Sequence, residues 1–177
     1  MKIVILCGGL GTRLAEETKI KPKPMVKIGR YPILIHLINY YKSFGYKEFI
    51  LALGFKSSYI KNFFKQKKIK GVKIHLVDTG KSSLTGGRLL RLKKCFTVDE
   101  NFMLTYGDGL SNVNLKKLSS FHKNHKKIAT VTAVRPPARF GELFMKNNIV
   151  NKFEEKPQTS QNWINGGFFI LNYKIFK

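Results

Sequence analysis

Residues 1–14 read MKIVILCGGLGTRL, and this stretch decides the fold. Lys2–Leu6 is a short apolar run rich in β-branched residues, which predicts a buried strand. The run leads directly into Gly8, Gly9 and Gly11, where the missing side chains let backbone N–H groups approach a ligand closely. Consecutive N–H groups in such a loop form a concavity that binds anions. The sequence therefore predicts a phosphate-binding loop directly after the first strand.

Two cations follow these glycines, and the pattern as a whole fits neither of the two common phosphate-binding loops. Arg13 supplies a planar guanidinium, and Lys23, within KPKPM at 21–25, supplies a compact ammonium. A Walker A loop requires a lysine directly after its last glycine, and none is present. A dinucleotide fingerprint requires a third glycine where Leu14 stands, and an acidic residue further on where this chain is basic. So many positive donors are best suited to a triphosphate.

The two motifs together, GGLGTRL at 8–14 and KPKPM at 21–25, resemble the sugar-1-phosphate nucleotidyltransferases. The resemblance covers nearly the whole chain. It implies an α/β, Rossmann-like fold, with a mostly parallel central sheet and helices on both faces. It also implies that Arg13 and Lys23 are catalytic groups acting on the triphosphate. The nucleotide contacts that it implies in the first loop are Leu6, Gly8, Gly9, Leu10, Gly11 and Thr12.

Bulk composition indicates one globular domain over residues 1–177. A hydrophobic fraction of 43% with 12% aromatic residues excludes a disordered chain. No apolar run approaches the length of a membrane span and no signal-peptide pattern is visible, so we expect a cytoplasmic protein without a membrane partner. The net charge of +23 suggests a basic nucleic-acid-binding protein. However, lysines outnumber arginines 27 to 6 and are scattered, so we expect no specific nucleic-acid partner.

The cysteines and one histidine pair have simple interpretations. Cys7 and Cys95 lie far apart without metal-binding spacing, which is typical of small buried apolar residues. His122 and His125 have helical spacing, but their neighbours are lysine and asparagine. They are therefore predicted to lie on a solvated helix surface rather than at a metal site.

Alternating strands and helices follow along the chain, which predicts a sheet covered by helices. In such sheets ligands bind beyond the carboxyl ends of the strands. Pro32 and Gly45 bracket one helix, and Asn147-Asn148 predicts the turn of a hairpin between 143–145 and 150–154. The expected strands are Lys2–Leu6, Glu48–Leu53, Val72–Val77, Phe102–Tyr106, Ala129–Val134 and Phe168–Leu171. The expected helices are Ile33–Phe44, Ser57–Lys67, Thr85–Phe96 and Leu115–His125, with Tyr59, Ile60, Phe63 and Phe64 facing inward.

Residues 78–88, DTGKSSLTGGR, form a loop of small residues that leads into a helix. Taken alone, this loop predicts only a turn with Thr85 as the N-cap residue. The resemblance implies more, because this segment is similar to the base-recognition loop of the family in the form typical of its cytidylyltransferases. Thr85, Gly86 and Arg88 are the nucleotide contacts that it implies.

Asp108 stands at the end of a hydrophobic strand within Tyr106-Gly107-Asp108-Gly109. A carboxylate presented in this way suits Mg²⁺ that bridges nucleotide phosphates. The resemblance implies that Asp108 is the Mg²⁺ ligand and that Gly107 contacts the nucleotide. The residues that it assigns to the sugar phosphate are Gly141, Glu155, Lys156, Asn165 and Gly166.

The implied reaction is attack by the phosphate of glucose 1-phosphate on the α-phosphorus of CTP, giving CDP-glucose and pyrophosphate. Such a product serves deoxysugar and surface-polysaccharide synthesis, as in O-antigens. Base choice depends on one loop, so dTTP, UTP or GTP stays open as the nucleotide. A catalytically incompetent nucleotide-sugar-binding relative also stays open, as does assembly into a homo-oligomer.

Two departures from the family pattern accompany the resemblance. Members of the family carry a longer segment where this chain has only Lys65–Gly71. They also continue beyond the position of Lys177 through a region with a second metal-binding aspartate. We therefore expect the domain 1–177 to be incomplete at its C-terminus, with the activity of this chain left open.

Overall fold

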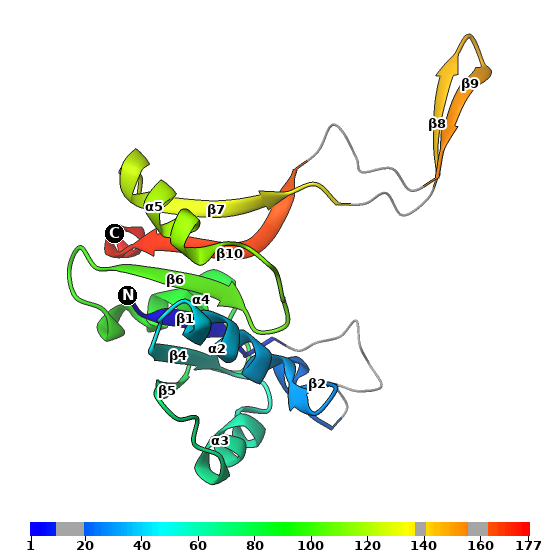
Figure 1. Cartoon of the computed structure of the whole chain (residues 1–177). Helices are drawn as coiled ribbons and strands as arrows, with labels where there is room; N and C mark the ends of the chain where they lie inside the picture. The colour runs from blue at the N-terminus through cyan, green and yellow to red at the C-terminus, as the bar shows by residue number, and fades with distance from the viewer. Residues whose placement is uncertain (10–19, 137–140, 156–162) are drawn as a thin grey trace. The chain divides into compact units, whose positions relative to one another are not determined.

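The computed structural model describes residues 1–9, 20–136, 141–155 and 163–177 (Figure 1). Its contacts gather in two compact units, which are described separately. Unit 1 comprises Met1–Thr130 with Gly167–Lys177, and unit 2 comprises Val131–Gly166. The expectation of a single domain stays a prediction. Within the described ranges, no helix combines the length and the apolar character needed to cross a membrane.

Six strands form one sheet in the order β5-β4-β1-β6-β10-β7. β1 runs parallel to both β4 and β6, β5 runs parallel to β4, and β10 runs antiparallel to β6. This confirms the predicted mostly parallel sheet. The strands are β1 Ile3–Leu6, β4 Glu48–Leu53, β5 Lys73–Asp78, β6 Asn101–Tyr106, β7 Ala129–Val134 and β10 Ile164–Asn172.

The first strand is buried on both faces because helices cover both sides of the sheet. Ile3 and Ile5 belong to one core cluster, whereas Val4, between them, belongs to another. Alternate side chains of a strand point to opposite faces, so these two clusters are the two sides of the sheet. The first side packs against α2 Ile33–Ser43, α3 Ser57–Gln66 and α5 Leu115–His125. The second packs against α4 Thr85–Arg91, η3 Lys93–Cys95 and η4 Tyr173–Phe176.

Turn chemistry places several of the element ends where the sequence predicts them. Pro32 precedes the first residue of α2, and Gly45 follows the helix with a φ of +91° that favours glycine. Asn147 and Asn148 also have positive φ, at 51° and 63°. They join β8 Glu142–Lys146 to β9 Ile149–Glu154 within unit 2, which confirms the predicted hairpin.

Three local predictions are wrong. The helix expected over Thr85–Phe96 ends at Arg91 and is followed by the short η3 turn. Leu84, not Thr85, is the N-cap residue, and no side chain caps this helix. Tyr59 is 41% exposed rather than inward-facing. Ile60 is the residue of α3 that is fully buried. Three short elements were not predicted, because they contain too few residues to show a hydrophobic pattern. They are η2 Lys23–Met25, β2 Lys27–Ile28 and β3 Tyr31–Pro32.

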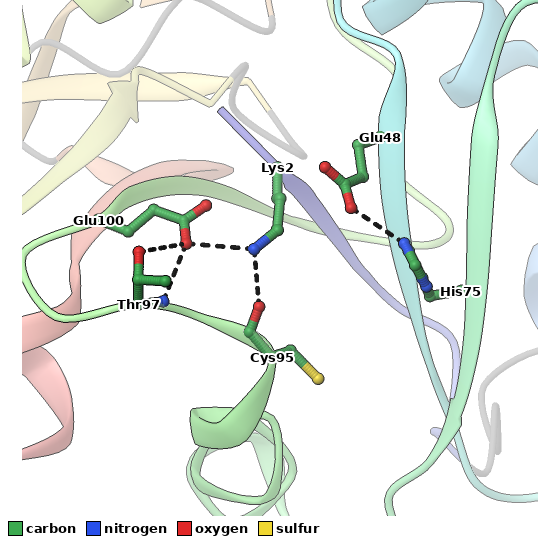
Figure 2. A network of polar contacts seen from close by, with 6 residues as sticks. All are labelled: Lys2, Glu48, His75, Cys95, Thr97 and Glu100. Carbon is green, nitrogen blue, oxygen red and sulfur yellow. Dashed lines mark hydrogen bonds and ion pairs between the residues drawn. The ribbon is translucent and has the colours of Figure 1, made fainter.

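A polar network anchors the amino end of β1, which is the end away from the glycine loop (Figure 2). Lys2 Nζ donates to the backbone oxygen of Cys95 at 2.8 Å and to Glu100 Oε2 at 3.2 Å. The same carboxylate oxygen accepts from the backbone N–H of Thr97 at 3.1 Å. These contacts fasten the first residues of the chain to the turn that precedes β6, and so support the pairing of β1 with β6.

The histidine pair on α5 is not the solvated surface that its sequence predicts. His122 is only 3% exposed, and its Nδ1 lies 2.7 Å from Thr130 Oγ1. His125 Nε2 lies 2.6 Å from the same oxygen. The lysine-rich neighbourhood misled the prediction, because both histidines of α5 contact Thr130 of β7.

Acidification is expected to lower the stability of the fold through His122. Its burial, together with the nearby His125, holds the pKa of His122 below the ordinary value of 6.5. The unfolded chain then takes up a proton that the folded chain does not, so the free energy of unfolding decreases as the pH falls through 6.5. Urea denaturation at pH 7.5, 6.5 and 5.5 measures this slope, and His122→Asn is expected to flatten it. An unchanged slope in that variant would contradict this origin.

Candidate functional site

A cleft of about 670 Å³ opens in unit 1 beyond the carboxyl ends of β1 and β6. The carboxyl ends of parallel strands are where such sheets present ligand-binding residues. The cleft brings together residues that are distant in sequence, and seven of the predicted nucleotide-site residues line it. They are Leu6, Gly8, Gly9, Lys23, Thr85, Arg88 and Asp108.

The backbone after β1 continues to pair beyond the strand ends, which fixes the glycine loop at the cleft. Cys7 N–H donates to the oxygen of Ala52 at 2.9 Å, and Gly107 N–H donates to the oxygen of Leu6 at 2.9 Å. Among the described residues, no atom would lie within 4 Å of a Cβ at Gly9. The predicted contact of Gly9 with a nucleotide stays a prediction.

Gly8 and Gly107 lack side chains for a second reason, which is packing against the protein itself. A Cβ at Gly8 would overlap the guanidinium of Arg88, and a Cβ at Gly54 would overlap the same group. A Cβ at Gly107 would lie 2.8 Å from the oxygen of Leu6. Part of the glycine pattern therefore serves the walls of the cleft and not only the approach of a ligand.

Arg88 joins three segments that border the cleft. Its side chain is 5% exposed, although it carries a charge. Buried charged groups need hydrogen-bond partners, and this guanidinium has them. It donates to five oxygens: Leu53 O at 3.2 Å, Thr79 Oγ1 at 2.9 Å, Gly80 O at 2.8 Å, Gly8 O at 2.6 Å and Lys81 O at 3.3 Å.

These bonds tie the glycine loop to the end of β4 and to the loop before α4. Thr79, which is fully buried, also donates from Oγ1 to the oxygen of Leu53 at 2.6 Å. The predicted contact of Arg88 with the nucleotide stays a prediction. In the described geometry its donors hold backbone oxygens, which makes Arg88 a support for the cleft wall.

Lys23 and Asp108, which both line the cleft, form an ion pair. Lys23 lies in η2, Asp108 follows β6, and each side chain is 31% exposed. Among the described residues, no group of three or more metal-ligating side chains gathers anywhere. One carboxylate in an open cleft fits Mg²⁺, which is usually held by one or two carboxylates together with substrate phosphates and water. The donor set at Asp108 is therefore compatible with the predicted Mg²⁺ ligand.

Cys7 lines the cleft but is not suited to act as a nucleophile. The side chain is 1% exposed, and burial, with the negative charge of Asp108, raises the pKa of its thiol far above the usual range. The thiol therefore stays protonated at neutral pH, whereas the reactive form of cysteine is the thiolate. Its burial confirms the prediction of a small apolar core residue.

The structure adds cleft residues that the sequence reasoning did not select. Most belong to the loop 81–84, whose composition marked it as a turn but did not show which of its side chains face the ligand. Lys81 is the most informative, because it adds a cation on the wall that carries Thr85. The signal in the sequence that could have indicated Lys81 was a lysine among small residues directly before a helix. The further lining residues are Cys7, Pro24, Lys81, Ser82, Ser83, Leu84 and Tyr106.

The predicted sugar-phosphate residues that the structure describes belong to unit 2. Gly141 precedes β8, and a Cβ there would lie 3.3 Å from Glu155 Oε2, so these two positions are neighbours. Asn165 and Gly166 lie inside β10 rather than before it, and a Cβ at Gly166 would be 2.9 Å from Thr132 Oγ1. Their assignment to the sugar stays a prediction. Leu10, Gly11, Thr12, Arg13 and Lys156 lie outside the described residues.

Comparison with known proteins identifies relatives along the whole chain. The family model described as nucleotidyl transferase matches residues 2–177. Glucose-1-phosphate cytidylyltransferase of Salmonella typhimurium is 46% identical over 99% of this chain and 76% of its own length. The protein described as probable glucose-1-phosphate cytidylyltransferase of Bacillus subtilis is 41% identical over the same shares. HddC from Yersinia pseudotuberculosis, solved in complex with GMP-PN, superimposes with a TM-score of 0.75 and 29% identity, covering 99% of this chain and 78% of HddC.

The match with the Salmonella protein runs over 196 positions, although this chain has 177 residues. The relative therefore carries additional residues within the matched range. The segment Lys65–Gly71 stays the predicted place of this shortening.

Proposed function

Because the chain belongs to the nucleotidyl transferase family, we propose that it transfers the cytidylyl group of CTP to glucose 1-phosphate and releases pyrophosphate. The observation that carries this proposal is the Lys23–Asp108 pair facing the glycine loop across one cleft, in a chain 46% identical to a glucose-1-phosphate cytidylyltransferase. The product would be CDP-glucose, which we propose serves deoxysugar and surface-polysaccharide synthesis.

The proposed chemistry is an in-line displacement at phosphorus. An oxygen of the sugar phosphate forms a new bond to the α-phosphorus of CTP, while the bond from that phosphorus to the bridging oxygen breaks. The electron pair of the broken bond leaves with pyrophosphate. The attacking phosphate is already an anion, so no general base is needed. Catalysis then consists of positioning the two reactants and neutralising their charge.

The residues of the cleft divide this work. The backbone at Gly8 and Gly9 receives the triphosphate at the end of β1, and Lys23 neutralises phosphate oxygens from the opposite wall. Asp108 would hold Mg²⁺, whose contribution when bound is further neutralisation of the phosphate charge. Lys81 adds positive charge beside the base loop. Arg13 and Lys156 are proposed to act on the triphosphate and on the sugar phosphate, respectively.

A guanylyltransferase is the second candidate. HddC, the solved relative at 29% identity, is in complex with GMP-PN, so closely related folds accept a guanine nucleotide. The base is proposed to lie along 81–88, where backbone groups of the loop offer donors and acceptors. Base preference is proposed to depend on this one loop, so the experiment that tests the first proposal also includes GTP.

Pyrophosphate release measured with CTP, GTP, UTP and dTTP in turn, each with and without glucose 1-phosphate and Mg²⁺, tests the proposal. We expect release that depends on both substrates and on Mg²⁺, with CTP preferred at least tenfold over the other nucleotides, a ratio that loop contacts to a base edge can supply. Preference for GTP would support the second candidate. Thermal stabilisation by CTP without any release would instead indicate a nucleotide-binding protein that lacks transferase activity.

A further inference from the structure

A second hollow in unit 1 lies at the other end of β6 from the cleft. Its volume is about 290 Å³, and Asn101, the first residue of β6, is part of its wall. We call it the basic pocket and define it by Lys123, Lys126, Lys127, Lys174 and His122, which line it. None of these residues takes part in the proposed transfer reaction, so the basic pocket requires its own explanation.

Four lysines converge on the basic pocket from separate parts of the chain. Lys123 comes from α5, Lys126 and Lys127 from the turn after it, and Lys174 from η4 near residue 177. In the described part of the chain, Lys174 alone among them pairs with a carboxylate, Asp99 at 3.5 Å. Like charges gathered around one small hollow repel each other, and a bound anion relieves that repulsion.

Two hydrogen-bond chains leave donors without partners at the basic pocket. The N–H of Lys127 donates to His125 Nδ1 at 2.9 Å, so in the neutral ring the proton of His125 is on Nε2, which donates to Thr130 Oγ1. The hydroxyl proton of Thr130 is then directed at His122 Nδ1. Neutral His122 therefore carries its proton on Nε2, for which the described residues provide no acceptor.

The second chain ends at Asn101. Asn172 Oδ1 accepts from the N–H of Lys174 at 3.0 Å, which assigns the other atom of its amide as nitrogen. That nitrogen donates to Asn101 Oδ1 at 2.7 Å. The amide nitrogen of Asn101 is thereby left as a donor without an acceptor among the described residues. The residues that line the basic pocket thus offer N–H donors, and no aspartate or glutamate is among them.

Helix electrostatics accounts for only part of this arrangement. The carbonyl groups at the C-terminal end of α5 attract cations, which explains Lys123 and Lys126 near that end. It does not explain Lys174, which comes from another element.

We propose that the basic pocket binds a compact phosphate anion, with pyrophosphate as its reference ligand. Lysines act as point charges and do not require the planar geometry that arginine pairs favour, which suits an oligophosphate. The basic pocket has a volume of about 290 Å³. It accommodates a pyrophosphate but is less than half the volume of the nucleotide cleft. This binding does not depend on the transfer reaction being correct.

The imidazole proton signals of His122 in NMR spectra provide a reporter that distinguishes the basic pocket from the cleft. Titration of the 177-residue chain with sodium pyrophosphate is expected to shift the His122 signals to saturation. The double variant Lys126→Gln/Lys127→Gln is expected to weaken this binding about tenfold, in line with the contribution of two exposed ion pairs. The matched control, Lys116→Gln/Lys117→Gln, removes the same charge from exposed positions at the other end of α5 and is expected to stay within twofold.

Three outcomes would overturn the proposal. The first is pyrophosphate binding, measured by calorimetry, that leaves the His122 signals unchanged, because binding would then be elsewhere. The second is equal weakening in the pocket variant and in the control, which would indicate an effect of net charge. The third is equal affinity for pyrophosphate, phosphate and sulfate at millimolar levels, which would indicate an adventitious ion only. All substitutions lie on exposed lysines, so each variant is expected to fold.

Discussion

Lys23→Ala is expected to lower the rate of CTP-dependent pyrophosphate release at least about 100-fold, the scale of losing one preorganised charge donor. Lys23 is the described cation that pairs with Asp108 across the cleft, so its loss leaves the developing charge on the phosphates uncompensated. Asp108→Asn is expected to cause a loss at least as large, because the amide keeps the shape of the side chain but binds Mg²⁺ poorly. Initial rates at saturating Mg²⁺ and glucose 1-phosphate measure both.

Lys27→Ala is the matched control for this prediction. It removes the same charge four residues away, from an exposed position on β2. We expect it to retain the wild-type rate. Both active-site variants should also retain the wild-type unfolding transition, because an ion pair between partly exposed side chains contributes little to stability. Wild-type rates in Lys23→Ala and Asp108→Asn would refute the assignment of the site.

Arg88→Met is expected to lower the free energy of unfolding by about 3 kcal/mol. The methionine fills much of the same space but donates no hydrogen bond. Gly80 O therefore loses its 2.8 Å bond, and among the described residues Gly8 O keeps only the 3.3 Å bond from the N–H of Phe55. A hydrogen bond from a charged donor contributes about 1.5–3 kcal/mol, and the loss of several such bonds is partly offset because no charge is buried any longer. Urea unfolding at pH 7.5 followed by circular dichroism measures the change.

Arg91→Met provides the comparison on the same helix. Arg91 is exposed, although it donates to the oxygen of Thr79 at 2.6 Å, so its replacement is expected to cost only about 0.5 kcal/mol. Gly8→Ala tests the packing of Arg88 against the glycine loop, since a methyl group at this position would overlap the guanidinium of Arg88. If Arg88→Met and Arg91→Met lose equal stability, Arg88 is not the residue that holds the three segments together.

Much of the fold follows from local signals in the sequence. The apolar run before Gly8 predicts β1, and Pro32 and Gly45 predict both ends of α2. Asn147-Asn148 predicts the hairpin. In each case the deciding residues lie within one element or at its border, where side-chain period and backbone preference act directly. The comparisons confirm the family that the glycine loop and KPKPM indicate.

The features that escaped prediction depend on contacts between distant residues. Arg88 reaches Gly8, which is 80 positions away in the chain, and no pattern around either residue reveals that the guanidinium replaces a missing side chain. His122 shares Thr130 with His125, although its neighbours in sequence are those of a solvated helix. Lys81 lines the cleft from a loop whose backbone accepts a hydrogen bond from Arg88. Such pairings are properties of the assembled sheet.

The ion pair between Lys23 and Asp108 has a consequence for the order in which ligands enter. With the cleft empty, each charge already has a partner, so the ammonium is screened by the carboxylate. A nucleotide that arrives with its metal can satisfy both side chains at once, the lysine through phosphate and the aspartate through the cation. A nucleotide without metal would satisfy only the lysine and would bring its own negative charge against the released carboxylate. Under the proposed function, we therefore expect the metal–nucleotide complex to enter as one species rather than metal and nucleotide in sequence.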